Sequence, residues 1–320
     1  GKLDGTDTEK AESARSFYFN PHFAKTVTAG TVTVETTGGT ADVIYTKPVR
    51  PAEPVQTPAY VRTARHLYDL SAYQSSYAAK GFLFKQELDI DYAAYTGYAG
   101  GFAPAGQTMP FRQNPIGADS ANPFMGTYDG GYHVIQNVFF PGDGSDRGLF
   151  GVFGKNGEGK LEDVVYKLNP GQSLSIVKSD RVGALVGTNR GAIENCAVYG
   201  VNMEVTSQYT GGLVGYNQGS VKNCAAELAN LSVGGGTAGG LVGLQDGKGS
   251  VENSYAVGRL ENDSGGGFAG LVGNGGTIKT SYAAVDVVSS GDRYGLCGGG
   301  TTSDGKSGWL KDVFVYRGIK

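Results

Sequence analysis

The sequence predicts an all-β protein built as a parallel β-helix, and two repeated patterns carry that prediction. A five-residue core of the form Gly-x-Leu-Val-Gly recurs at intervals of 25 to 30 residues, centred on Leu185, Leu213, Leu241, Leu271 and, in a degenerate last copy, Leu296. A short run of the form Val/Ile-x-Asn follows the cores, bounded by glycine and without helical periodicity. A repeat of this length is typical of a solenoid, in which each unit stacks on the one before it.

The stacking explains the residues that repeat. The leucines should form one inward column, with neighbours one rung apart at roughly 4.8 Å. Asn195, Asn223 and Asn253 occupy equivalent positions, so we expect an amide ladder at an inward corner. The repeated glycines fit corners that need a positive φ or a close backbone approach. These residues are interpreted as scaffold, and the lining of a ligand site is the alternative.

Composition limits the partners. The chain has 320 residues, of which 54 are glycine, and a net charge of −3 from 27 basic and 30 acidic residues. No basic stripe appears, so we expect no nucleic-acid partner. No apolar run reaches the roughly 18 residues of a membrane span, so we expect no transmembrane segment. We expect the chain to be a monomer.

The cysteines and histidines give no sign of a metal, a cofactor or a disulfide framework. Cys196, Cys224 and Cys297 are odd in number and lie at strand positions. Parallel, inward-pointing side chains have poor disulfide geometry, so we predict reduced, buried thiols. The three histidines are far apart and match no ligand spacing, so the sequence predicts no metal site and no cofactor.

The chain divides into three predicted parts. Residues 1–46 form an N-terminal β segment with a turn at Gly38-Gly39, either part of a sandwich domain or a cap on the solenoid. Residues 47–59 form a proline-rich linker. Residues 60–320 form the β-helix. The polar start at Gly1 does not look like a signal peptide, so we interpret the chain as an excised or mature piece.

One helix is predicted, from Thr63 to Tyr73, and it should cap the solenoid. Thr63 can cap its start, and apolar residues follow at helical spacing, namely Ala64, Leu67, Leu70 and Ala72. An open β-helix end exposes core and unpaired backbone, which a helix can cover.

Acidic residues follow this helix. Glu87, Asp89 and Asp91 alternate along a predicted strand, so they should share one face, with Leu88, Ile90 and Tyr92 on the other. The face is interpreted as solvated; a cation or partner contact and a glycosidase-like carboxylate pair about 7 Å apart are the alternatives. The segment 143–146, Asp-Gly-Ser-Asp, is interpreted as a polar turn, with a calcium loop as the alternative.

An aromatic loop at 93–113 is the predicted contact surface. It has Tyr92 at its base and carries Tyr95, Tyr98, Phe102 and Phe111. Aromatic side chains on a loop can stack on sugar rings or anchor a protein partner, so the hypothesis is a non-catalytic surface for a glycan or a host or extracellular-matrix protein. The alternative is a local cluster folded against the solenoid.

These patterns together resemble the GLUG motif. The cores and the following Asn-Ser/Cys pairs carry the likeness, with upstream segments similar to its lead-in at 61–71, 88–91, 115–117 and 124–131. The resemblance covers residues 60–300; residues 1–50 lie outside it, the loop 93–113 is longer than usual and the last copy is degraded. It implies a right-handed β-helix on a bacterial cell surface or outside the cell. It also implies no catalytic residues, as in adhesin-like proteins and the non-catalytic regions of immunoglobulin A peptidases.

Three classes of function remain. The first is a non-catalytic cell-surface module, an adhesin or a structural stalk. The second is an accessory region of a larger secreted enzyme such as a peptidase, and the third is a polysaccharide-active β-helix enzyme. The sequence favours the first, because it supplies scaffold residues in bulk and no convergent acid, base or metal set.

Overall fold

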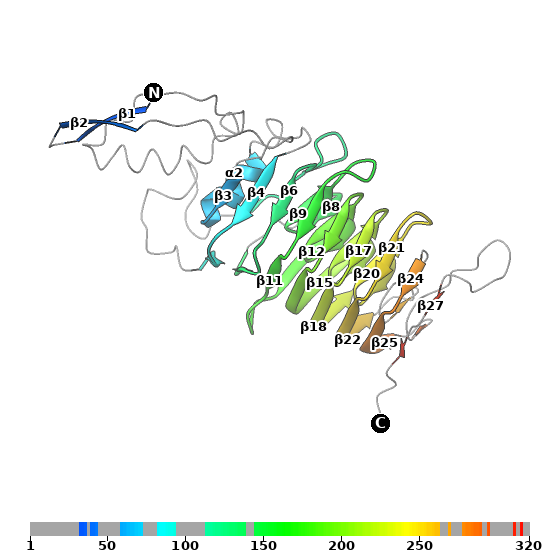
Figure 1. Cartoon of the computed structure of the whole chain (residues 1–320). Helices are drawn as coiled ribbons and strands as arrows, with labels where there is room; N and C mark the ends of the chain where they lie inside the picture. Colours follow the sequence, from blue (N-terminus) through cyan, green and yellow to red (C-terminus); the bar gives the residue numbers. More distant parts are fainter. Residues whose placement is uncertain are drawn as a thin grey trace.

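The structure, a computed structural model, is a parallel β-solenoid (Figure 1). It describes residues 32–36, 39–43, 58–72, 82–93, 113–138, 144–262, 268–269, 277–289, 293–294, 310–311 and 314–315. Strands of successive turns pair in parallel and stack along one axis from β3 to β27. This confirms the predicted all-β solenoid.

Three sheets form the walls. The first has nine strands, in the order β3 (Ala59–Val61), β4 (Leu83–Gln86), β6 (Thr127–Asp129), β10 (Lys160–Glu162), β14 (Ala192–Glu194), β17 (Ser220–Lys222), β21 (Ser250–Glu252), β24 (Thr277–Lys279) and β27 (Leu310–Lys311). A four-stranded sheet contains β9 (Phe150–Phe153), β13 (Val186–Asn189), β16 (Val214–Asn217) and β20 (Val242–Gln245). The remaining wall is a thirteen-stranded sheet.

The thirteen-stranded sheet contains the longest strands. Its members are β5 (Ile90–Asp91), β7 (Val134–Gln136), β8 (Asp146–Arg147), β11 (Val165–Lys167), β12 (Leu174–Gly183), β15 (Ala197–Gly211), β18 (Ala225–Val233), β19 (Thr237–Gly239), β22 (Tyr255–Asn262), β23 (Phe268–Ala269), β25 (Tyr282–Ser289), β26 (Arg293–Tyr294) and β28 (Phe314–Val315). β28 pairs with β25, so this sheet continues to Val315 within the described residues.

The predicted leucine column is present. Leu185, Leu213 and Leu241 are fully buried. Their backbones are joined from rung to rung, with the Leu185 N–H donating to the Leu213 carbonyl at 3.2 Å and the Leu213 N–H donating to that of Leu241 at 2.9 Å. Leu271 and Leu296 lie outside the described residues.

Close backbone approach explains the core glycines. A β-carbon on Gly211 would lie 2.0 Å from the Val214 carbonyl oxygen, and one on Gly219 would lie 2.1 Å from that of Gly191. Real β-carbons do not come this close to a backbone oxygen, so only glycine fits. The prediction that the repeated glycines serve tight corners is confirmed at both positions.

The predicted asparagine ladder exists, but its orientation was predicted wrongly. Asn223 donates to Asn195 at 2.9 Å and Asn253 donates to Asn223 at 3.3 Å. Asn223 and Asn253 are exposed, so the ladder lies on the outside of the corner. All three asparagines have left-handed backbone, with φ from 49° to 55°. The inward place at each corner belongs to the next residue, such as Cys196 or Cys224.

A second amide ladder, which sequence reasoning missed, lies inside the solenoid. Asn189 donates to Asn217 at 2.8 Å, and Asn217 donates to Gln245 at 3.4 Å. All three side chains are buried and also bond to backbone groups, so their polar atoms have partners. The third position of the ladder is a glutamine, Gln245, so the sequence does not repeat asparagine at all three positions and the ladder was not recognised from it.

Helix α2 (Ala64–Ala72) lies at the end of the stack beside β3 and β4 (Figure 1). The Thr63 hydroxyl accepts from the His66 N–H, which confirms the predicted start. Leu67 and Leu70 join the core, as expected for a cap. Ala72 is exposed, contrary to the prediction; Ser71 is buried instead, and its hydroxyl bonds to the Tyr68 carbonyl.

The N-terminal segment is described only as a hairpin. β1 (Val32–Thr36) and β2 (Gly39–Val43) pair antiparallel, from Val32 with Val43 to Thr36 with Gly39. The hairpin agrees with the turn predicted near Gly38. The choice between sandwich domain and cap stays a prediction, and the linker up to residue 57 lies outside the described residues.

Candidate functional site

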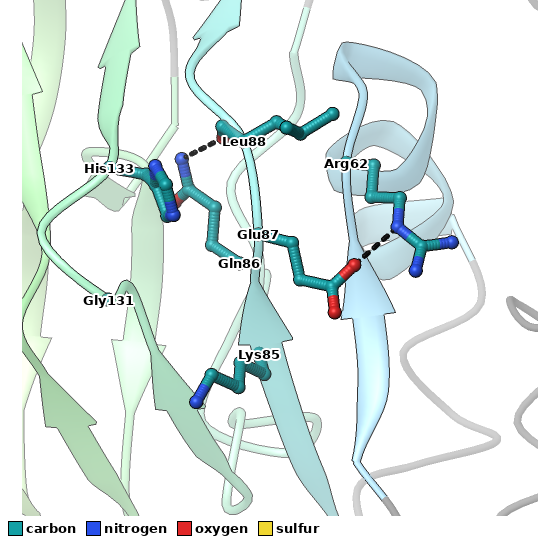
Figure 2. A pocket seen from close by; sticks show the side chains of 7 residues that line it. All are labelled: Arg62, Lys85, Gln86, Glu87, Leu88, Gly131 and His133. Atoms are coloured by element: carbon teal, nitrogen blue, oxygen red, sulfur yellow. Dashed lines mark hydrogen bonds and ion pairs between the residues drawn. The ribbon is translucent and has the colours of Figure 1, made fainter.

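A surface hollow of about 450 Å³ lies beside the first turns of the solenoid (Figure 2). It is lined by Arg62, Lys85, Gln86, Glu87, Leu88, Gly131 and His133. Arg62 follows β3, the next four residues come from β4 and the turn after it, and the last two come from the turn between β6 and β7. The hollow therefore lies at one corner of adjacent rungs, where the chain passes from the nine-stranded to the thirteen-stranded sheet.

This corner is longer here than in the rungs that follow. In the register of the strands, Lys85 aligns with Asp129 and Ile90 aligns with Ile135. The corner between these two aligned positions holds four residues in the β4 rung, 86–89, and five in the β6 rung, 130–134. The next rung has only three, 163–165, and so do the four after it. The extra residues widen the corner and produce the hollow.

Two ion pairs and one histidine–carboxylate contact lie around the hollow. The Arg62 guanidinium donates through Nε to the Glu87 carboxylate, as Figure 2 shows, and stacks over the Tyr60 ring at 5.2 Å. Lys85 Nζ lies 3.6 Å from Asp129 Oδ2. His133 Nδ1 lies 3.4 Å from Asp89 Oδ1. Sequence reasoning singled out Glu87 and Asp89 but not their basic partners, because the members of the group come from three separate stretches.

Two large apolar side chains stay exposed at the widened corner. Leu88 is 54% exposed and Tyr132 is 61% exposed. Tyr132 also has a left-handed backbone with φ of 60°, which is uncommon for an aromatic residue. A hydrogen bond with the Asp163 carboxylate raises the pKa of the Tyr132 hydroxyl.

The three carboxylates predicted to share one strand face do not share it. β4 ends at Gln86 and β5 begins at Ile90, so Glu87 and Asp89 lie in a turn between two sheets. Glu87 pairs with Arg62, while Asp89 accepts from the Val134 N–H at 2.9 Å. The turn also leaves Leu88 exposed, where the strand prediction had placed it opposite the acids.

Asp91 serves the wall of the solenoid. Its carboxylate accepts from the Asn137 amide at 2.6 Å and from the Gln136 amide at 3.1 Å. The described residues contain no cluster of three or more metal-binding side chains. The cation site and the glycosidase-like pair proposed for these acids therefore lose the shared face on which both depended.

Asp146, in the predicted polar turn, is held inside the structure. Its carboxylate accepts from the Thr188 hydroxyl and from Arg181 Nη1, the latter at 3.3 Å. The residue is buried. Asp143 lies outside the described residues. The other carboxylate of the calcium alternative, that of Asp146, is already bonded to protein groups.

Of the five predicted partner-binding residues, the structure describes only Tyr92. Its ring is fully buried, and its hydroxyl donates to Gln113 Oε1 at 2.5 Å. Gln113 Nε2 donates in turn to the Leu67 carbonyl at 3.2 Å. Tyr92 therefore joins the two ends of the loop to the helix, and its ring is not part of the surface. Tyr95, Tyr98, Phe102 and Phe111 lie outside the described residues.

Cys196 and Cys224 are free and buried, as predicted. Each thiol donates to the carbonyl of the residue two before it, at 3.1 Å. Burial raises the pKa of the Cys196 thiol well above its ordinary value. Cys297 lies outside the described residues.

Comparison with protein families identifies the repeat. The model named "the GLUG motif" matches residues 206–231 and 234–261. These two rungs are GLUG motifs. The first GLUG motif begins within β15 and ends within β18, and the second ends within β22, so each contains one corner with its Gly-Gly-Leu-Val-Gly core. The resemblance deduced from the sequence is confirmed.

Two relatives share part of the chain. One is described as a Gly-rich membrane protein of Evansella cellulosilytica, 34% identical over 146 residues, which are 45% of this chain and 14% of that protein. The other is the halomucin of Haloquadratum walsbyi, 30% identical over 138 residues, which are 42% of this chain and 1% of that protein. The chain thus spans a small part of each relative. No helix within the described ranges has the length and apolarity needed to cross a membrane.

One solved structure has a similar fold. It is the crystal structure of a candidate immunoglobulin A1 protease from Bacteroides ovatus. The TM-score is 0.50 at 22% identity, with 80% of this chain and 74% of that chain covered. At this identity the likeness concerns the fold alone.

Proposed function

We propose that the chain is a non-catalytic module of a bacterial cell-surface protein, an adhesin or a structural stalk. In this proposal it acts as a monomer outside the cell and contacts a glycan or a host or extracellular-matrix protein through the loop 93–113. The GLUG rungs support the surface or accessory role, since they are built from scaffold residues. The names of the two relatives, a membrane protein and a halomucin, support the location.

The observation that carries the proposal is the anchoring of the loop. Its ends meet at the hydrogen bond between Tyr92 and Gln113, which is buried and tied to the helix. A loop held at both ends by a rigid scaffold is a common arrangement for binding residues. Its four aromatic residues provide the side chains that most often anchor partners.

A second candidate is an accessory region of a larger secreted enzyme such as a peptidase. The chain spans only a small share of each relative, which favours a module within a larger protein. This holds for the first candidate and for the second alike. The third candidate, a polysaccharide-active enzyme, rested on the carboxylates of residues 87–91, and these occupy separate places.

A binding array tests the proposal. The native chain and the variant Tyr95→Ala/Tyr98→Ala are applied to immobilised glycans and extracellular-matrix proteins. We expect the native chain to bind at least one ligand and the double variant to bind it at least tenfold more weakly. Tyr282→Ala, which removes another exposed aromatic ring, is the matched control and should bind like the native chain. Equal binding by the double variant would contradict the role of the loop.

A further inference from the structure

We propose that the open edge of strand β25 is a docking site for one more strand, and that residues 316–320 of this chain occupy it. The proposal rests on the backbone and the core residues that the last described rungs leave uncovered. It is independent of the proposed function, because β25 lies at the opposite end of the solenoid from helix α2, to which the loop 93–113 is anchored (Figure 1).

The backbone of β25 is paired completely on one side only. β25 pairs with β22 at every position from Tyr282 to Ser289. On the other side it pairs with β28 at two positions, Tyr282 with Phe314 and Ala283 with Val315. Among the described residues, no strand faces 284–289 on that side. The N–H and carbonyl groups of such an edge are a template for a further strand.

The core is uncovered at the same place. By strand register, Val287 continues an inward column that runs through Met203, Leu231 and Leu260. These three side chains are at most 1% exposed, but Val287 is only partly buried. In a solenoid each layer of the core is covered by the next rung, so the partial exposure of Val287 marks the end of the covered core.

The edge also lacks the features that usually protect an outermost strand. Such strands typically carry several charges or a proline, which oppose pairing with another strand. Residues 284–289 contain no proline and a single charge, that of Asp286, and the Asp286 carboxylate accepts from Arg259 of β22 at 3.1 Å. Val288 is 38% exposed at this edge. The sequence of β25 is therefore typical of a strand that lies between two others.

Residues 316–320 are the segment best placed to fill the edge. They follow Val315, which is already opposite Ala283, so no loop has to close before they pair. In the same register Ile319 would lie opposite Val287 and cover it. Arg317 and Lys320 provide the charges of an outermost strand, which the edge of β25 lacks.

Charge favours this segment over a second copy of the chain. The segment 316–320 has two cations and no anion. The carboxylates of Glu261 and Asp286 share one guanidinium, that of Arg259, so negative charge is in excess among these three residues. A second copy paired symmetrically at this edge would bring the same carboxylates towards each other. The edge 284–289 is also much shorter than a stable interface, which buries at least about 1,200 Å².

The test measures amide hydrogen exchange by mass spectrometry in the full chain and in a variant that ends at Val315. We expect the amides of 284–289 that point away from β22 to exchange at least tenfold faster in the truncated variant. Ile319→Asp should have the same effect, because it would place a charge against Val287, whereas Ile319→Val should keep the protection. Strands β12 and β15 lie several rungs from the edge, so unchanged exchange there would show that the fold persists in every variant.

The outcomes separate the possible occupants of the edge. Equally fast exchange at 284–289 in the full chain and in the truncated variant would overturn the proposal, because the edge would then be open in both. Protection that survives both the truncation and Ile319→Asp would assign the edge to another segment and reject residues 316–320. Light scattering over a range of concentrations accompanies the exchange. We expect a protected edge in a monomer, and protection that appears only in a dimer would assign the edge to a second copy instead.

Discussion

His66 is a helix residue that the fold keeps uncharged. Its Nδ1 accepts a hydrogen bond from the Arg62 N–H at 3.1 Å, which requires a nitrogen without a proton. Burial and, to a smaller extent, the nearby charges of Arg62 and Arg65 together lower the pKa of His66 to about 4. In the unfolded chain the pKa returns to about 6.5.

This shift predicts a loss of stability in mild acid. Because the folded pKa is the lower one, the contribution of His66 is fully present above pH 6.5 and is lost as the pH falls towards 4. The loss should be up to about 3 kcal/mol. Urea unfolding at pH 7 and pH 4.5 measures it. His66→Asn keeps an acceptor at the same place but cannot titrate, so its stability should change less between the two pH values. An equal change in both proteins would contradict the prediction.

The buried thiols give a second prediction at this scale. In a Cys297→Ser variant, which leaves only Cys196 and Cys224, a thiol reagent should label neither residue in the native state at neutral pH. Both should react after denaturation, because burial protects them and raises the pKa of Cys196. Rapid labelling of two thiols in the folded protein would show that this part of the wall opens.

Among the elements, the two amide ladders differ in what they contribute to stability. Asn217 lies in the inward ladder, accepts from Asn189 and the Gly219 N–H, and donates to Gln245 and Ser250. Asn217→Ala should destabilise the protein by about 2 kcal/mol or more, because it leaves buried polar groups without partners.

Asn223→Gly, in the outward ladder, is the matched comparison. It should cost less than about 1 kcal/mol, since water can replace the lost bonds and glycine keeps the positive φ. Thermal denaturation of both variants checks the order, and a larger loss for Asn223→Gly would contradict it.

Much of the fold could be predicted because the repeat marks the same place in every rung. Leu185, Leu213 and Leu241 recur at equal spacing, and a 28-residue turn admits few other arrangements. The repeat does not show which residue of a corner points into the core and which points to solvent. Asn195 and Cys196 are neighbours in the sequence, and a left-handed backbone at the asparagine decides which of them points inward.

The candidate site was harder to predict than the scaffold. Arg62, Lys85 and His133 belong to three stretches that only the register of the first strands brings together. The one available signal was length: residues 130–134 fill a corner that needs only three residues in later rungs. That comparison requires knowing where each strand begins, which the sequence alone leaves uncertain by a few residues.

At the scale of the whole molecule, the described strands pair with their counterparts in the rungs before and after, so one rung should be removable. Deleting residues 211–238 joins Thr210 to Gly239 and restores the Gly-Gly-Leu-Val-Gly core without a gap. We expect a folded protein whose urea m-value falls by about a tenth, in proportion to its length. The control removes half a rung, residues 211–224, and should not fold, because every later strand then faces the wrong sheet. Circular dichroism and urea titration compare the two, and loss of folding in the full-rung deletion would contradict the prediction.

The parallel stacking of the strands also decides how the module would respond to a pulling force. Backbone hydrogen bonds between rungs lie along the solenoid axis, as between Leu185 and Leu213, while each strand runs across it. A load applied at the two ends would act on the terminal strand first and peel it away a few bonds at a time. Each 28-residue rung released this way would add roughly 100 Å of extended chain. The molecule would therefore lengthen in steps under tension, with the remaining rungs still intact, and behave as an extensible tether.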